Sequence, residues 1–323
     1  MAILEKLQIF LITYNREKYL FRTLSKILAS ESPIRDFDIT IIDNASTDNT
    51  PDIIQTFQKE HANLKHLRNR KNIGGNANIV RALESGSKDY VWVLCDDDDY
   101  DWSGWPELEA AIQNNEDIIC VCNFNLKPTQ RNAIPYLLNQ MTFLPSIVIK
   151  TCLIDAVALR NMYDNIFTMF PHLVPIVSHF NKGGRAFALT QPVVVLSDDR
   201  GFSGFLRGYQ PENIFKRARS MSMPIGFANI VSNLTDKTLA RKTFITHIAG
   251  DYPERLGWPL FFREMFIHYK GHDQDPHFTD LFQVLPWHLR IALKLIHKAQ
   301  NTPFHTLLMN SFLYKVLKRH AKR

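Results

Sequence analysis

The sequence predicts an α/β protein in which a mixed, mainly parallel sheet is flanked by helices on both faces and is followed by a helical C-terminal region. The first observation behind this prediction is that four short, apolar, β-branched segments alternate with helical segments in the first hundred residues. The second is that each of these four segments ends in polar residues, at the edge where such sheets bind ligands. The third is that helical periodicity prevails from about Asn213 onward.

Composition agrees with a globular protein. The chain has 323 residues, of which 45% are hydrophobic, 22% charged and 11% aromatic. This balance provides a large core and excludes disordered, collagen-like and coiled-coil proteins. No signal peptide is visible at the start, and no apolar run approaches the ~18 residues that would cross a bilayer, so we expect a cytoplasmic protein.

The first hundred residues contain the parallel part of the predicted sheet. Their strands are expected at Leu7–Thr13, Asp38–Asp43, Leu64–Arg68 and Tyr90–Cys95. The helices between them are expected at Glu17–Ala29, from Thr50-Pro51 onward, and at Asn76–Ser85. Thr50 is predicted to be the N-cap of its helix, with Pro51 at the first helical position.

The following hundred residues continue the pattern less regularly. A helix is expected at Trp102–Asn114, another near Leu153–Asn161 and a third from about Pro171. Strands are expected at Ile118–Cys122, Ser146–Ile149, Ala186–Leu189 and Val193–Leu196. Pro128–Leu144 is interpreted as a loop.

Four consecutive aspartates, Asp96 to Asp99, follow the apolar run Val91–Leu94. Adjacent carboxylates repel one another, and a hard divalent cation such as Mg²⁺ or Mn²⁺ that prefers oxygen ligands would relieve this repulsion. Such an ion keeps open positions for phosphate oxygens, so a metal-bridged diphosphate is the expected ligand. A solvated acidic turn is the alternative interpretation.

Two other strand ends point to the same chemistry. Asp43 can accept hydrogen bonds from a nucleobase or a ribose, and the glycines of Asn72–Gly75 permit close approach of the backbone to a ligand. The motifs G-x-G-x-x-G and G-x-x-x-x-G-K-[ST] are absent, which argues against NAD-dependent oxidoreductases and P-loop phosphotransferases.

Four motifs in this order resemble family 2 glycosyltransferases, which have the GT-A fold. They are Leu11–Arg16, Ile41–Asp48, Asn72–Asn76 and Asp96–Asp98. The resemblance covers about residues 6–200 and is strongest to bacterial enzymes that assemble lipopolysaccharide O-antigen or capsular polysaccharide, including the abequosyltransferase-like group. It implies a Rossmann-like, nucleotide-binding half.

The resemblance also implies the residues of a site. Those expected to bind a nucleotide-sugar are Thr13, Tyr14, Asn15, Arg16, Asp43, Asn44, Ser46, Asn72, Gly74, Gly75, Asp96 and Asp97. Those expected to bind the divalent metal, Mn²⁺ or Mg²⁺, are Asp96, Asp97 and Asp98. Asp96/Asp98 and Asp97/Asp99 both fit the D-x-D motif of the family, and we favour the first pair.

Family 2 enzymes generally invert the anomeric centre, and this requires a base to take the proton of the acceptor hydroxyl. Many carry a Glu-Asp pair at a helix start for this purpose, but here the stretch is Phe170–Leu173, without an acidic pair. His172 is therefore the first candidate for the base, against the alternative of a packing histidine. Asp198 and Asp199 are the competing candidates.

The resemblance implies a GT-A catalytic domain over residues 1–204, with a nucleotide-sugar half at about 1–100 and an acceptor half at about 101–204. Residues 205–323 are expected to form a helical C-terminal region.

The end of this region, Leu281–Arg323, contains eight Lys and Arg and no acidic residue, whereas the whole chain has a net charge of +6. A basic, amphipathic end fits peripheral contact with an anionic inner membrane leaflet, or packing on the rest of the chain. No nucleic-acid-binding module accompanies this charge.

The sequence thus predicts a glycosyltransferase that transfers a sugar from a nucleotide-diphosphate sugar to a hydroxyl of a glycan or lipid-linked glycan. Two alternatives stay open. A nucleotidyltransferase that makes a sugar nucleotide can share the architecture, although Thr13–Arg16 lacks the glycines of its usual phosphate loop. A non-catalytic nucleotide-binding scaffold would retain the pocket without a working base.

Overall fold

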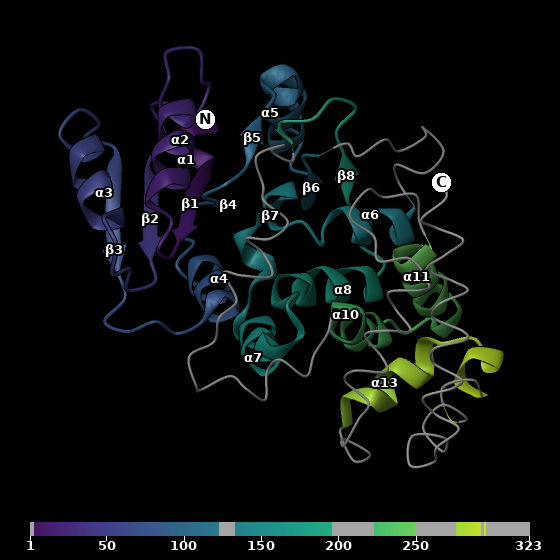
Figure 1. Cartoon of the computed structure of the whole chain (residues 1–323). Helices are drawn as coiled ribbons and strands as arrows, with labels where there is room; N and C mark the ends of the chain where they lie inside the picture. Colours follow the sequence, from purple (N-terminus) through teal and green to yellow (C-terminus); the bar gives the residue numbers. More distant parts are fainter. Residues whose placement is uncertain (1–2, 123–132, 196–222, 250–275, 292–293, 295–323) are drawn as a thin grey trace, which may run out of the picture. The chain divides into compact units, whose positions relative to one another are not determined.

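The computed structural model describes residues 3–122, 133–195, 223–249, 276–291 and 294 (Figure 1). The chain divides into two compact units. The first consists of residues 1–166 and 170–211, and the second of residues 167–169 and 212–323.

The first unit is built on a seven-stranded sheet with the order β3-β2-β1-β4-β7-β6-β8. The strands are β1 (Leu7–Thr13), β2 (Ile39–Asp43), β3 (Leu64–Arg68), β4 (Tyr90–Cys95), β6 (Ile118–Cys120), β7 (Ile147–Lys150) and β8 (Phe187–Ala188). Strands β1 to β4 are parallel, β7 runs antiparallel to both β4 and β6, and β6 is parallel to β8. A separate pair joins β5 (Asp99–Tyr100) to β9 (Val194–Val195). The predicted mixed sheet is confirmed.

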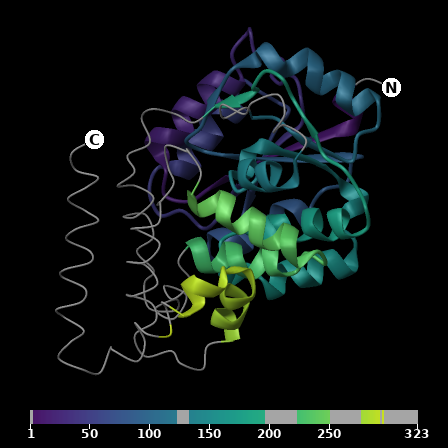
Figure 2. The same ribbon diagram turned by 90° about the vertical axis from the view of Figure 1, so that its right-hand side faces the viewer.

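The helices of the first unit are α1 (Ile3–Lys6), α2 (Glu17–Ile27), α3 (Thr50–Gln58), α4 (Gly75–Glu84), α5 (Trp105–Gln113), α6 (Ile134–Gln140), α7 (Ala156–Asp164) and α8 (Val174–Asn181). Short 3-10 turns lie at Trp102–Gly104, Leu144–Ser146, Thr151–Leu153 and Pro171–Leu173. The second unit contains α10 (Met223–Ser232), α11 (Lys237–Ala249) and α13 (Pro276–Val284), which pack on one another (Figure 2). Among the described residues, no helix has both the length and the apolar character to span a bilayer.

The core of the first unit explains why its central strands are continuous apolar runs. Strands β1 and β4 pair along their lengths in the centre of the sheet. Helices pack on both faces of the sheet at these two strands. On one face, Ile9 and Trp92 pack in a cluster with Leu24 of α2. On the other, Val93 shares a small apolar cavity with Leu83 of α4. Helices therefore cover both faces, as the alternating pattern predicts.

Three predictions about helices differ from the structure. Thr50 is the first residue of α3 rather than its N-cap, because its hydroxyl accepts a hydrogen bond from the Arg16 amide, 3.1 Å away. The segment interpreted as a loop contains α6, in which Leu137 and Leu138 are buried and Pro135 occupies the first turn. A third helix, α7, begins later than expected because the Asp155 side chain caps it by accepting a hydrogen bond from the Ala158 amide.

Candidate functional site

The carboxyl ends of the parallel strands bring three predicted site residues into one row. The register pairs Thr13 of β1 with Asp43 of β2, and Asp43 with Arg68 of β3. On the other side of β1, Ile12 pairs with Cys95, so Asp96 follows β4 beside Thr13. These residues lie at the edge where parallel sheets bind their ligands.

Asp96 is held on several sides. Its Oδ2 accepts a hydrogen bond of 2.7 Å from the Thr13 hydroxyl, and its backbone carbonyl accepts one of 2.9 Å from Thr23 of α2. Burial raises the pKa of Asp96 to about 6, although Arg16 acts in the opposite direction and Asp97 adds to the rise. The Asp96 carboxylate is therefore a fixed acceptor whose charge depends on a nearby cation.

Arg16 is that cation. Its Nε lies 3.2 Å from Asp96 Oδ1, and its Nη2 contacts Asp97 Oδ2. Farther along α2, Arg22 donates to the Asp97 carbonyl at 3.0 Å and Lys26 pairs with Asp99. The acidic loop after β4 is thus compensated by cations from α2 and from Arg16, the residue just before it.

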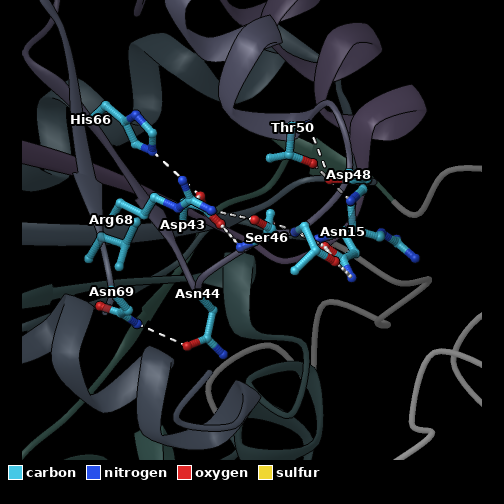
Figure 3. A network of polar contacts seen from close by, with 12 residues as sticks. Asn15, Asp43, Asn44, Ser46, Asp48, Thr50, His66, Arg68 and Asn69 are labelled. Atoms are coloured by element: carbon cyan, nitrogen blue, oxygen red, sulfur yellow. Dashed lines mark hydrogen bonds and ion pairs between the residues drawn. The ribbon is translucent and has the colours of Figure 1, made fainter. Parts of the chain in front are cut away.

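Asp43 closes the turn after β2 (Figure 3). Its side chain is fully buried, its Oδ1 accepts a 2.8 Å hydrogen bond from the Ser46 amide, and its Oδ2 lies 3.3 Å from Arg68 Nε. His66 Nε2 is 3.7 Å from the same oxygen. Burial alone would raise the pKa of Asp43, but His66 and Ser46 together lower it. Asp43 is therefore a charged acceptor at neutral pH.

The loops after β1 and β2 are tied to each other. The Asn15 amide donates to the Ser46 hydroxyl at 2.9 Å (Figure 3). The Asn15 side chain accepts a hydrogen bond of 2.7 Å from the Thr47 amide. Asn15 has a φ of 52°, in the left-handed region that asparagine tolerates better than most residues. Tyr14, beside it, is 38% exposed. The loop thus fixes Asn15 and leaves Tyr14 available to a ligand.

A network of asparagines connects the ends of β2 and β3 to α4. Asn44 donates to Asn72 at 2.8 Å and accepts from the side chain of Asn69 at 2.9 Å (Figure 3 shows the second bond). Asn69 also donates to Asn78 inside α4. Asn72 accepts from the Gly74 amide at 2.8 Å, and Gly74, with a φ of 89°, leads into Gly75 at the start of α4. This network holds the backbone of the predicted ribose and diphosphate region in place.

An open groove of about 540 Å³ lies next to this network. It is lined by Arg68, Asn69, Arg70, Lys71, Ile73 and Arg81. Arg68 pairs with Asp43, whereas Arg70, Lys71 and Arg81 form no ion pair within the part of the chain that the structure describes. Three uncompensated cations around one groove favour an anionic ligand.

His172 is not placed as a base requires. The residue is 4% exposed, its Nε2 is 3.1 Å from the Met141 carbonyl, and burial lowers the pKa of its imidazole to about 4. It lines an apolar cavity with Leu83 of α4 and Val93 of β4. This geometry supports the packing histidine rather than the proposed base. Asp198 and Asp199 lie outside the described residues.

The donor atoms fit a divalent metal only in part. No group of three or more His, Cys, Asp or Glu side chains that could hold a metal occurs among the described residues. Asp96, Asp97 and Asp98 follow one another directly after β4, and their role as metal ligands stays a prediction. One or two of these hard oxygen ligands, with phosphate oxygens completing the shell, still match the preference of Mg²⁺. The guanidinium of Arg16 already occupies a cation position between two of them.

Several residues that shape the site were not predicted. Arg22, Thr23 and Lys26 hold the acidic loop, and Asn69 and Asn78 hold the asparagine network. A signal for the first group exists in the sequence, because Arg16, Tyr19, Arg22 and Lys26 recur at the spacing of one helix face. Asn69 and Asn78 lie in segments that are no more polar than other loops and helix surfaces, so the sequence gives no signal for them.

Comparison with known proteins agrees with this geometry. A family model described as "Glycosyl transferase family 2" matches residues 8–191, which is more than half of the chain. Abequosyltransferase RfbV of Salmonella typhimurium is 25% identical over 218 residues, which cover 58% of this chain and 65% of that protein. The GalNAc(5)-diNAcBac-PP-undecaprenol beta-1,3-glucosyltransferase of Campylobacter jejuni is 30% identical over 95 residues, 29% of this chain and 30% of that protein. The matched parts span less than two thirds of these two relatives.

Among solved structures, residues 1–349 of TarS from S. aureus superpose with a TM-score of 0.53, covering 91% of this chain and 86% of that one. At 15% identity, this likeness concerns the fold alone, and it confirms the GT-A fold. Because the family model matches the parallel strands and their ligand-binding edge, the chain belongs to glycosyl transferase family 2.

Proposed function

We propose that this chain transfers a sugar from a nucleotide-diphosphate sugar to a hydroxyl of a glycan or lipid-linked glycan, with inversion, during synthesis of a bacterial surface polysaccharide. The observation that carries the proposal is the row of Asp43, Thr13 and Asp96 at the sheet edge of a family 2 chain. The names of the two relatives, an abequosyltransferase and an undecaprenol-linked glucosyltransferase, support the substrate class.

The nucleoside is proposed to bind over β1 and β2. Asp43 is a buried, charged acceptor suited to a donor group on a base, and the exposed Tyr14 offers an aromatic surface next to it. Asn72 and Gly74 are proposed to border the ribose and the diphosphate. The neighbouring groove with Arg70, Lys71 and Arg81 favours the approach of this anionic ligand.

The leaving group is proposed to depart at the acidic loop. Mn²⁺ or Mg²⁺, held by one or two of Asp96, Asp97 and Asp98, would supply Lewis-acid stabilisation of the departing nucleoside diphosphate. Thr13 and Thr23 fix the position of Asp96, so the loop needs little rearrangement to accept charge.

The acceptor proton needs a different base from the buried His172. We propose Asp198 or Asp199, which follow the strand β9 in sequence and precede Arg200 and Gly201. A carboxylate in this role deprotonates the attacking hydroxyl as the nucleoside diphosphate leaves. The lipid-linked acceptor would be met at the inner face of the membrane, to which the basic end of the chain is proposed to bind peripherally.

The test is calorimetric titration of UDP, GDP, dTDP and CMP into the protein, with Mn²⁺ or Mg²⁺ and again with EDTA. We expect tight binding of one nucleotide and a loss of affinity in EDTA. Sugars linked to that nucleotide are then tested for transfer to an acceptor extract. Binding of none of the nucleotides, with or without metal, would overturn the proposal, and binding without any transfer would favour a nucleotide-binding scaffold.

A further inference from the structure

One face of α2 is built around the acidic loop. Arg16 immediately precedes the helix, and Tyr19, Arg22, Thr23 and Lys26 follow at helical spacing, so these side chains project on one side. Thr23 and Arg22 bind the backbone carbonyls of Asp96 and Asp97, respectively, and thereby fix the loop itself. Arg16 and Lys26 contact carboxylates instead.

Arg16 is held at both of its ends. Its backbone amide donates to the Thr50 hydroxyl at 3.1 Å, and its guanidinium lies 4.2 Å from the centre of the Tyr19 ring. The Arg16 side chain is 23% exposed, and those of Asp96 and Asp97 are 9% and 26% exposed. A half-buried guanidinium stacked on an aromatic ring and bound to two carboxylates is a positioned group rather than a chance surface pair.

The site therefore already contains a cation where a metal is proposed to bind. The guanidinium contacts Asp96 Oδ1 and Asp97 Oδ2, while the Thr13 hydroxyl holds Asp96 Oδ2, so a divalent ion between the two carboxylates competes with Arg16. We infer that Arg16 is the exchangeable counter-ion of Asp96 and Asp97, and that a divalent cation binds these carboxylates only by displacing the Arg16 guanidinium. This inference rests on the proposed metal-assisted transfer.

The exchange couples the metal to the nucleotide. A displaced guanidinium without a partner is unfavourable, but a nucleoside diphosphate bound at the same edge supplies phosphate oxygens with which arginine forms strong hydrogen bonds. The diphosphate thus favours release of Arg16 from the carboxylates, and this release favours the metal. Because such coupling is reciprocal, the metal and the nucleotide each raise the affinity of the other.

The test measures Mn²⁺ binding to the full chain by electron paramagnetic resonance of free Mn²⁺, without nucleotide and with a saturating nucleoside diphosphate. The variants are Arg16→Gln and, as a matched control, Lys26→Gln, which removes a cation of the same helix that pairs with Asp99. We expect Arg16→Gln to bind Mn²⁺ at least about tenfold more tightly than the parent without nucleotide, the effect of one partly buried ion pair. Lys26→Gln should change this affinity by less than about threefold. The increase in Mn²⁺ affinity caused by the nucleotide should be smaller in Arg16→Gln.

Unchanged or weaker Mn²⁺ binding in Arg16→Gln would overturn the inference, as would an equal gain in Lys26→Gln. Circular dichroism establishes that each variant is folded. Should Arg16→Gln not fold, Arg16→Lys keeps the charge but not the fork that reaches both carboxylates, and a smaller gain in Mn²⁺ affinity is expected. The nucleotide titration separates the two proposals. Nucleotide binding with no effect of Arg16 rejects the exchange alone, whereas absence of nucleotide binding in the parent rejects the proposed function.

Discussion

The carboxylates after β4 differ in their surroundings, residue by residue. Asp98 is 1% exposed and Asp96 is 7% exposed, so removing either charge would also disturb packing and hydrogen bonds. The Asp97 side chain is 26% exposed and is therefore the better place to test the metal.

We predict that Asp97→Asn keeps the fold but weakens metal-assisted binding of the nucleoside diphosphate by about tenfold or more, because a charged ligand becomes neutral. The measurement is calorimetric titration with Mn²⁺, with the melting temperature as the check on folding. Asp52→Asn is the matched control, because Asp52 is an exposed carboxylate of α3 away from the acidic loop. Equal affinity in Asp97→Asn and the parent would contradict the prediction.

His172 gives a prediction for stability in acid. The ordinary pKa of histidine is 6.5, and burial lowers that of His172 to about 4. Between these two pH values, only the unfolded state binds the proton. The contribution of the neutral His172 to the unfolding free energy is therefore complete above pH 6.5 and is lost as the pH falls through about 4. The contribution is about 3 kcal/mol.

We therefore expect His172→Leu to reduce the loss of unfolding free energy between pH 7 and pH 4, measured by urea denaturation at each pH. His61→Leu, at a partly exposed position, is the control replacement. Parallel acid profiles for His172→Leu and the parent would show that His172 is not the residue responsible.

Among the elements, the start of α4 depends on one backbone conformation. Gly74 has a φ of 89° and a ψ of 150°, a combination that residues with a Cβ rarely adopt. We predict that Gly74→Ala costs about 1–3 kcal/mol of unfolding free energy and weakens nucleotide binding, because the amide that bonds to Asn72 must shift. Gly75→Ala, one residue inside the helix, should cost much less. Denaturant titration of both variants compares them directly, and similar losses would refute the argument.

The loop after β3 provides a second test of an element. Arg70 and Lys71 line the groove and form no ion pair with any residue that the structure describes, so their charges are available to an anion. We predict that Arg70→Gln with Lys71→Gln lowers nucleoside diphosphate affinity about tenfold and makes it less sensitive to salt. Lys65→Gln is the control, since Lys65 is an exposed residue of β3 that lies 3.9 Å from Asp38. Calorimetry at two salt concentrations measures both effects, and an unaltered salt dependence would count against the groove.

How much the sequence predicts differs between elements and site residues. Strands β1, β3 and β4 match the predicted bounds. In β1 and β4 the reason is a buried apolar run that is bounded by polar turns, whereas β3 has only Leu64 buried. Thr50 and His172 were assigned from local pattern alone, and both depend on distant partners, namely the Arg16 amide and the cavity under β4. The spacing of Arg22 and Thr23 places them on one helix face, but nothing local shows that this face lies against the acidic loop.

At the scale of the whole molecule, charge is unevenly distributed. Leu281–Arg323 carries +8 in a chain of net charge +6, which leaves the rest of the chain at −2. We predict that the full chain sediments with vesicles containing anionic lipid and not with neutral phosphatidylcholine vesicles, and that binding falls as salt is raised. Equal binding to both vesicle types, or none to either, would remove the membrane from the proposal.

The second unit includes three residues that lie in sequence between the two segments of the first. Residues 167–169 belong to it, and α10 approaches them so closely that a Cβ on Gly226 would lie 1.9 Å from the Thr168 carbonyl oxygen. Thr168 itself is 1% exposed. A gene shortened after residue 211 would lack α10, which packs on residues 167–169. The buried Thr168 would then be exposed to solvent, so the remaining residues would not form a self-sufficient catalytic domain. Expression of such a fragment is expected to yield aggregated protein, and directed evolution of acceptor preference should mutate the full-length gene.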